Sequence, residues 1–289
     1  MAKVKPLTSR SWQRKFTRAE QHLEEVARLA LAFLAAEPYI AVEDVNHEDR
    51  SPGPNGFRSV SHTWRGIIRQ KPPSDWSPII GDCLNNLRSS LDHVTWALAG
   101  GQGSKTAFPI FIDPGEYKRL TPGRHLKYVP EDAKTFIESL QPYHHVNGAK
   151  AHALFLLDRL TNDDKHRELL GTEVGISHVH VDGPVGQMAR GDQLVFEFAP
   201  QDERLFENGA ILVRYHTSNP DVYVPLRFTF DVAIDPKGPA AAQPLMGCLA
   251  RSLVDVWLIL SEIENRFFGG TLTHLIDPPL KGRADFQII

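Results

Sequence analysis

Apolar residues recur three and four positions apart in five stretches of the chain, which predicts five helices. The first covers residues 11–36 and ends before Pro38, because proline cannot continue a helix. We expect the others at about 76–99, 131–140, 149–160 (or on to 170) and 244–268. Glycine and proline interrupt the stretch between 101 and 129, which we therefore expect to be a long irregular connection.

Alternation of apolar and polar residues predicts two regions of β-structure. Residues 39–70 favour a β-hairpin, because two extended segments flank a turn-forming sequence at 51–56. Four further stretches alternate with a period of two, which is typical of half-buried antiparallel strands. These lie at 173–181, 193–198, 210–215 and 222–234.

Elements in this order predict an α+β fold. We expect a helical bundle of about five helices with an N-terminal β-hairpin and an inserted four-stranded antiparallel β region. The whole chain, 1–289, is expected to form a single domain. Its predicted parts are a helical core at 11–170 with the hairpin at 39–70, an antiparallel region at 171–235, and a C-terminal helix at 244–268 that packs back on the core.

The composition is that of an ordinary globular protein. Of 289 residues, 42% are apolar and 23% are charged, which excludes a wholly disordered chain, a collagen and a disulfide scaffold. Both cysteines, Cys83 and Cys248, lie among apolar helical residues, so we expect buried free thiols. No run reaches the ~18 apolar residues of a membrane span. We therefore expect a cytoplasmic protein with no membrane partner.

Charge is unevenly distributed along the chain. Lys and Arg number 32 against 35 Asp and Glu, but the first 18 residues hold six basic residues and no acid. The rest of the chain is therefore acidic, unlike a surface that coats nucleic acid. The basic N-terminus either attracts a polyanion or is the solvated start of the first helix.

The predicted helix at 76–99 carries a polar stripe opposite its apolar one. At about 100° per residue, the apolar stripe comprises Ile80, Leu84, Leu87, Leu91, Val94 and Leu98. Arg88 and Asp92 lie between the two stripes. Asn, Ser and Asp are weaker helix formers than Glu, Lys and Gln, so their use predicts a hydrogen-bonding role. The polar stripe comprises Asp82, Asn86, Ser89 and His93.

A second polar cluster lies at the end of the fourth predicted helix. If the helix continues, Asn162 and His166 share a face, and Asp163 lies three residues before His166. A carboxylate so placed would hold one ring nitrogen, raise the pKa of the imidazole and leave a proton donor near neutral pH. Arg167 would add a forked hydrogen-bond donor for an anionic ligand.

These two segments resemble the paired signatures of a broad group of uncharacterised bacterial proteins common in actinobacteria. The signatures are roughly Asn-Leu-Arg-Ser-x-Leu-Asp-His and Asn-x-x-Asp-Lys-His-Arg. Residues 86–93 fit the first, and residues 162–167 resemble the second with one position fewer after the Asn. The segments Phe108-Pro109-Ile110-Phe111 and Leu140-Gln141-Pro142-Tyr143 also resemble that group. The resemblance covers most of residues 12–170 and implies no established activity.

A more remote resemblance is to HEPN-type helical domains, which carry an Arg-x(4–6)-His motif on a helix. Arg88 and His93 have this spacing, and Asp92 lies between them. The resemblance implies metal-independent RNA cleavage across a homodimer groove, with His93 as general acid and base and Arg88 holding the phosphate. Residue 89 is Ser, where many such motifs have the more polar Asn, Asp or His. Arg159 and His166, with six residues between them, also fit the Arg-x(4–6)-His pattern.

Other interpretations stay open. One alternative is that polar bonds of Arg88, Asp92, Asp163 and His166 tie two helices together. Another is a non-catalytic pocket for a small anionic ligand or a partner, formed by the same four residues and Asn86.

A metalloenzyme is a third hypothesis, because His178, His180 and Asp182 would share one face of a strand. The chain has no phosphate-binding loop, dinucleotide fingerprint or Gly-x-Ser-x-Gly elbow, so we expect no cofactor.

Overall fold

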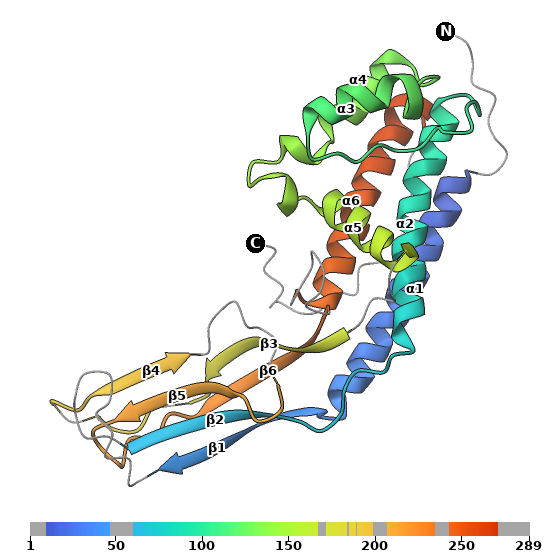
Figure 1. Ribbon diagram of the computed structural model, residues 1–289. Coiled ribbons are helices and arrows are strands. Elements are labelled where there is room, and N and C mark those ends of the chain that lie inside the picture. The colour runs from blue at the N-terminus through green and yellow to red at the C-terminus, as the bar shows by residue number, and fades with distance from the viewer. Residues whose placement is uncertain are drawn as a thin grey trace. The chain divides into compact units, whose positions relative to one another are not determined.

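The computed structural model describes residues 10–46, 60–166, 172–183, 185–188, 190–198, 207–234 and 243–270. It contains helices and antiparallel strands, as Figure 1 shows. Contacts divide the chain into two compact units, each assembled from separate stretches. The helical unit comprises Met1–Val26, Trp76–Leu170 and Cys248–Ile289, and the β unit comprises Ala27–Asp75 and Gly171–Gly247. The expectation of a single domain stays a prediction.

The structure describes six α-helices. They are α1 (Ser11–Ala35), α2 (Trp76–Leu98), α3 (Pro114–Leu120), α4 (Glu131–Ser139), α5 (Ala153–His166) and α6 (Leu245–Ile263). Four short helical turns accompany them: η1 (Thr121–His125), η2 (Pro142–His144), η3 (Ala149–Ala151) and η4 (Glu264–Phe268).

Helix α3 lies where the sequence suggested an irregular connection, so that expectation was wrong. The helix is only seven residues long, too short for an apolar repeat to become visible. Its start is nevertheless encoded locally. Asp113 accepts a hydrogen bond from the backbone N–H of Glu116, and Pro114 occupies the first turn, where its missing N–H costs nothing.

Helix α2 follows its predicted pattern. Leu84, Leu87, Leu91 and Val94 are fully buried, and α2 packs against α5. Leu98, the last member of the predicted stripe, is half-buried. On the opposite side the polar stripe is half-buried to exposed. The helix therefore forms through burial of one face, as its sequence pattern requires.

The end of the C-terminal helical stretch contacts the start of α1. Glu264 is fully buried, pairs with Arg10 at 2.7 Å and accepts a hydrogen bond from Trp12 Nε1 at 3.3 Å. The Trp12 ring stacks on Phe268, with 5.1 Å between the ring centroids. The helical unit thus joins residues from both ends of the described chain.

The described residues of the β unit form six strands in two antiparallel sheets. The strands are β1 (Tyr39–Asn46), β2 (Val60–Ile68), β3 (Thr172–Val181), β4 (Leu194–Phe198), β5 (Ile211–Thr217) and β6 (Leu226–Ile234). One sheet has the order β1-β2-β5-β4, and the other consists of β3 and β6.

The predicted hairpin pairing of β1 with β2 is confirmed, whereas the turn at 51–56 lies outside the described residues. The four later strands divide between the two sheets: β5 and β4 extend the hairpin, and β3 pairs with β6.

Aromatic side chains join the two sheets. Trp64 of β2 lies against Phe228 of β6, with 5.3 Å between the ring centroids, and Tyr39 of β1 lies against Phe230 at 5.9 Å. Because alternate residues of a strand share a face, Phe228 and Phe230 both point toward the four-stranded sheet. The unit is therefore a small two-layer structure with an aromatic interior.

These observations confirm the predicted α+β class. Cys83 and Cys248 are buried thiols that are not joined in a disulfide, as expected. Among the residues described, no helix is both long and apolar enough to span a bilayer. The cytoplasmic location stays a prediction.

Candidate functional site

Arg88 and Asp92 hold the same backbone segment. Arg88 Nη2 donates a hydrogen bond to the carbonyl oxygen of Phe108 at 2.7 Å, and the N–H of Phe108 donates to Asp92 Oδ1 at 2.9 Å. The two side chains lie one turn apart on α2, 3.5 Å from each other, and are 17% and 34% exposed. Together they fasten the loop 101–108 to the helix. The contact is with a loop and not with a second helix, so the link between two helices considered from the sequence stays a prediction.

The turn η1 brings His125, which the sequence analysis missed, toward the same two residues. Burial lowers the pKa of His125, and the neighbouring charges of Arg124 and Arg88 lower it further. A hydrogen bond with the backbone of Lys105 and the carboxylate of Asp92 act in the opposite direction. No local spacing links position 125 to α2, so only the folded chain reveals this cluster.

Two buried nitrogens of the cluster have no hydrogen-bond partner among the residues described: Arg88 Nη1 and His125 Nδ1. Buried polar atoms are rarely left in this state, because each costs the free energy of its lost hydration. The cluster is therefore a polar centre of the helical unit whose hydrogen bonds are only partly satisfied by the described residues.

The predicted catalytic pair does not share one environment. Arg88 is turned toward Phe108 and Asp92, whereas His93 is about 140° further around the helix axis. His93 is half-buried, and no hydrogen bond holds its side chain within the described part of the chain. Of the predicted neighbours, Ser89 is half-buried, and Asn86 donates to the carbonyl of Asp82 at 2.7 Å.

The second predicted cluster is only partly visible. Asp163 and His166 belong to the last turns of α5, but their side chains are not among those described. Arg167 lies outside the described residues altogether. The side chain of Asn162 donates to Asp158 Oδ2 at 3.2 Å. Convergence of this cluster with α2 stays a prediction.

The loop 101–108 also contacts two exposed aromatic residues. Gly101 adopts a φ of +76°, and a Cβ atom there would lie 3.1 Å from the Trp96 ring. A Cβ atom on Gly103 would lie 2.9 Å from the ring of Tyr128. Trp96 is 43% exposed and Tyr128 is 44% exposed, large values for such side chains. Glycine thus lets the backbone run close beneath both rings.

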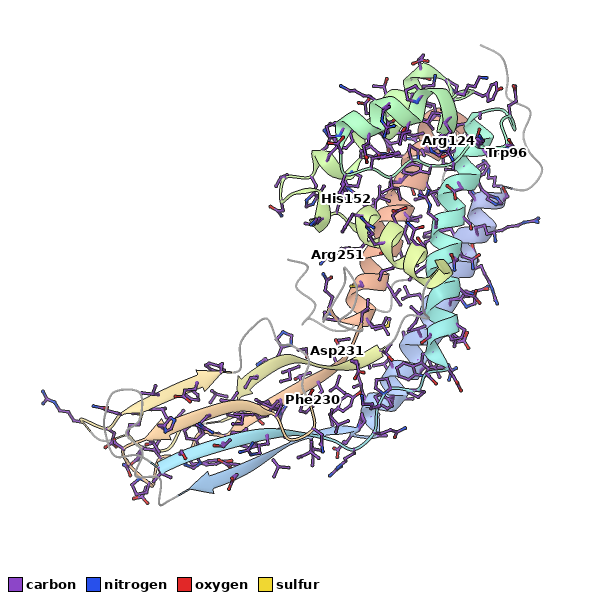
Figure 2. The ribbon with its side chains drawn as sticks, viewed as in Figure 1. Trp96, Arg124, His152, Phe230, Asp231 and Arg251 are labelled. Carbon is purple, nitrogen blue, oxygen red and sulfur yellow. The ribbon has the colours of Figure 1, made fainter. Side chains whose placement is uncertain are left out.

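Exposed basic side chains lie in the same two segments of the chain, the loop 101–108 and the stretch 121–128. Lys105, Arg124 and Lys127 are exposed, and the Lys127 Nζ lies 5.1 Å from the centroid of the Tyr128 ring. We call Trp96, Tyr128, Lys105, Arg124 and Lys127 the aromatic-basic surface; Figure 2 labels Trp96 and Arg124. A signal was present in the sequence, because Trp96 lies three residues after His93, on the same face of α2.

The histidines proposed for metal binding lie on β3. The rings of His178 and His180 stack with 5.4 Å between centroids, so they share a face as predicted. Asp182, however, pairs with Arg227 at 2.7 Å. In the described part of the chain, no group of three or more His, Cys, Asp and Glu side chains is placed to hold a metal ion.

Comparisons of the chain with protein-family models, with curated proteins and with solved structures found no match. The two family resemblances therefore stay predictions, and a function has to be inferred from the residues themselves.

Proposed function

We propose that this chain binds single-stranded RNA on the aromatic-basic surface and cleaves it without a metal ion. One observation carries the proposal: Trp96 is an exposed tryptophan one helical turn from His93, on the same face of α2. Proteins bind unpaired bases by stacking them on aromatic rings beside cations that hold the backbone. A base stacked on Trp96 would bring its neighbouring phosphate toward His93.

The chemistry requires only groups of this chain and of the RNA. His93 would remove the proton from a ribose 2′-hydroxyl, whose oxygen then attacks the adjacent phosphorus. The bond between phosphorus and the 5′-oxygen breaks, the protonated His93 returns its proton to that oxygen, and a 2′,3′-cyclic phosphate is left. Because the nucleophile belongs to the substrate, no metal-bound water is needed.

The contacts of Arg88 change the role that the family resemblance implies for it. Its guanidinium is engaged by Phe108 and Asp92, so in this proposal Arg88 positions the loop 101–108. The exposed cations Lys105, Arg124 and Lys127 would neutralise the phosphates. Homodimerisation, which the resemblance also implies, is tested by sedimentation of the full chain.

The decisive experiment measures cleavage of end-labelled single-stranded RNA by the full chain in excess chelator. We expect cleavage by the wild type and a loss of at least about 100-fold in His93→Ala, the size of a missing general acid or base. His144→Ala is the matched control, because His144 is an exposed histidine of the same unit. No cleavage by the wild type, or equal rates in both histidine variants, would contradict the proposal.

Binding is measured separately by fluorescence anisotropy of labelled RNA. Stacking contributes about 1–3 kcal/mol per base, so Trp96→Ala should weaken binding by roughly 5- to 150-fold. Phe198→Ala is the control, because Phe198 is an exposed aromatic of the β unit. If Trp96→Ala and Phe198→Ala bind RNA with equal affinity, Trp96 does not stack on an RNA base and this part of the proposal is wrong. The small anionic ligand predicted from the sequence would then be sought by thermal shift.

A further inference from the structure

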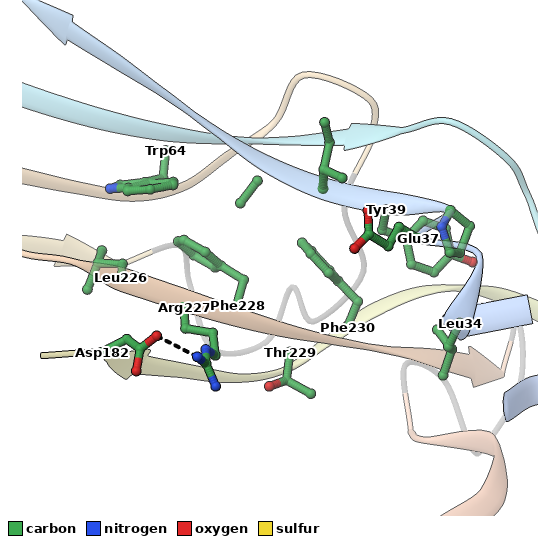
Figure 3. A pocket seen from close by; sticks show the side chains of 13 residues that line it. Leu34, Glu37, Tyr39, Trp64, Asp182, Leu226, Arg227, Phe228, Thr229 and Phe230 are labelled. Carbon is green, nitrogen blue, oxygen red and sulfur yellow. Dashed lines mark ion pairs between the residues drawn. The ribbon is translucent and has the colours of Figure 1, made fainter.

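The β unit contains a cleft that the sequence analysis did not anticipate. It has a volume of about 530 Å³, within the size range of small-molecule sites. Its walls are mostly apolar and aromatic and come from α1, β1, β2 and β6. The residues used below are Leu34, Tyr39, Trp64, Leu226, Phe228 and Phe230. Figure 3 shows Trp64 and Tyr39 on one side and Phe228 and Phe230 on the facing strand.

The rings that line the cleft hold one another in place. Besides the contacts of Trp64 with Phe228 and of Tyr39 with Phe230, the rings of Phe228 and Phe230 lie nearly parallel, at 18° and 6.5 Å. A site whose walls are already packed loses little conformational entropy when a ligand enters. Aromatic walls favour a ligand with a flat π-system, which gains stacking contacts that a flexible chain does not.

Two polar atoms of this apolar lining are buried without a hydrogen-bond partner among the described residues: Tyr39 Oη and Trp64 Nε1. Tyr39 is only 4% exposed. Burial raises the pKa of its hydroxyl, and Glu173 and Asp231 raise it further, so the group stays protonated at neutral pH. Both groups are therefore donors that lack an acceptor, and an indole N–H can only donate.

Charge at the mouth of the cleft is nearly balanced. Arg227 pairs with Asp182 at 2.7 Å, and the remaining charged lining residue, Glu37, is exposed. Because Arg227 already has an acidic partner and a second acid lies nearby, a strongly anionic ligand gains little here. A neutral ligand fits both the walls and the rim.

We propose that this cleft binds a small, neutral, planar aromatic molecule that carries a hydrogen-bond acceptor such as a carbonyl oxygen. The flat ring of the ligand would lie along the aromatic side chains that line the cleft, and its acceptor would take the N–H of Trp64 or the hydroxyl of Tyr39. This proposal concerns the β unit and is independent of the RNA proposal, which concerns the helical unit.

The test uses three probes with the full chain, measured by calorimetry. Coumarin is planar with a carbonyl acceptor, naphthalene is planar without an acceptor, and octanoate is a flexible aliphatic anion. We expect coumarin to bind about tenfold or more tightly than naphthalene, because an unpaired buried donor penalises a ligand that cannot accept its hydrogen bond. Octanoate should bind least well.

Two variants show which donor of the protein pairs with the acceptor of the ligand. Trp64→Phe and Tyr39→Phe keep the apolar walls but each removes one donor, so at least one should bring the coumarin-to-naphthalene ratio close to one. Phe198 does not line the cleft, so Phe198→Ala should leave the ratio of coumarin affinity to naphthalene affinity unchanged. Trp64 is also the only tryptophan of the β unit, so a change in emission that disappears in Trp64→Phe places the probe at this site.

Several results would overturn the proposal. These are no binding of any probe, tighter binding of octanoate than of coumarin, or a ratio that neither donor variant changes. Sedimentation of the same samples tests whether a second copy of the chain occupies the cleft. A dimer that dissociates on addition of coumarin would show that it does, and would also overturn the proposal. RNA cleavage by Trp64→Phe should equal that of the wild type, which keeps this outcome separate from the RNA proposal.

Discussion

Arg88 and Asp92 together satisfy both backbone hydrogen-bonding groups of Phe108, its carbonyl oxygen and its N–H. A charged side chain on each group makes these bonds stronger than bonds between neutral groups. The arrangement explains why an arginine and an aspartate occupy half-buried positions of α2. Their first effect is on the loop 101–108, and through it on the aromatic-basic surface.

The Phe108 clamp leads to a stability prediction. Arg88→Met should lower the free energy of unfolding by about 1–3 kcal/mol, because the carbonyl of Phe108 loses its partner in a part-buried site. Urea denaturation measures the change, with Arg14→Met, an exposed arginine of α1, as control. Combining Arg88→Met with Asp92→Ala should give non-additive losses, since the two residues share one partner. Additive losses would show that the two contacts act independently.

Glu20 on α1 gives a prediction about pH. Burial raises the pKa of this carboxyl from 4.5 to about 7. Between these values the folded state binds more protons than the unfolded state, so stability decreases as pH rises through this window. The loss amounts to about 3 kcal/mol at most, and the full stability is present only below about pH 4.5.

Urea denaturation between pH 5 and pH 8 tests this assignment. Glu20→Gln keeps the shape without the charge, so its stability should fall less over this range, and the variant should exceed the wild type at pH 8. Glu24→Gln, at an exposed position on the same helix, is the control. Parallel pH profiles for Glu20→Gln and the wild type would contradict the assignment to Glu20.

At the scale of elements, the long apolar repeats were sufficient to predict α2, and the alternating stretches to predict the strands. Apart from the hairpin of β1 and β2, the pairing of the strands was not predictable, because a period of two shows which residues share a face and not which strand lies alongside. The separation of β3 and β6 from β4 and β5 depends on register and on aromatic contacts between residues distant in sequence. Helix α3 was missed because it is too short to show a repeat.

In the candidate site too, contacts within one helix were predictable from the sequence, whereas contacts between elements were not. The pairing of Arg88 with Asp92 is an i, i+4 contact and was accessible from the sequence. Their shared partner, Phe108, belongs to the loop 101–108, and the nearby His125 belongs to η1. The spacing of residues within α2 therefore could not predict either neighbour. The cleft of the β unit was missed for the same reason, since its walls come from strands far apart in the chain.

The start of α3 is a local feature that can be tested alone. Asp113→Ala removes the side chain that accepts the N–H of Glu116 at 2.7 Å, and should cost about 1 kcal/mol. Asp113→Asn retains an acceptor and should cost clearly less. The free energies of unfolding in urea give both values. Equal losses in the two variants would mean that Asp113 does not act as the cap.

At the scale of the whole molecule, the helical unit depends on its last stretch. Leu249, Val256, Leu260 and Ile263 of α6 are nearly or completely buried, although this helix enters the unit only after residue 247. The β unit is likewise assembled from two separated stretches. Neither core is therefore encoded by one continuous segment.

Two leucines of α6 form a matched pair for testing this dependence. Leu260 is completely buried, whereas Leu258 is 52% exposed. Leu260→Ala should lower the free energy of unfolding by about 2–5 kcal/mol, because it removes buried atoms and leaves a cavity. Leu258→Ala should change it by less than about 0.5 kcal/mol. Similar losses of unfolding free energy in the two variants would contradict the burial of Leu260 and the exposure of Leu258 in α6.

The late position of α6 has a consequence for biosynthesis. A ribosome that adds about 5–20 residues per second needs roughly 10 to 40 seconds to proceed from the end of α1 at Ala35 to the codons after Gly247. Throughout that time the nascent helical segments expose apolar faces whose final neighbour has not been made. We therefore expect recombinant yield to rise when holdase chaperones are co-expressed, and to fall when growth temperature speeds aggregation of unfinished polypeptides.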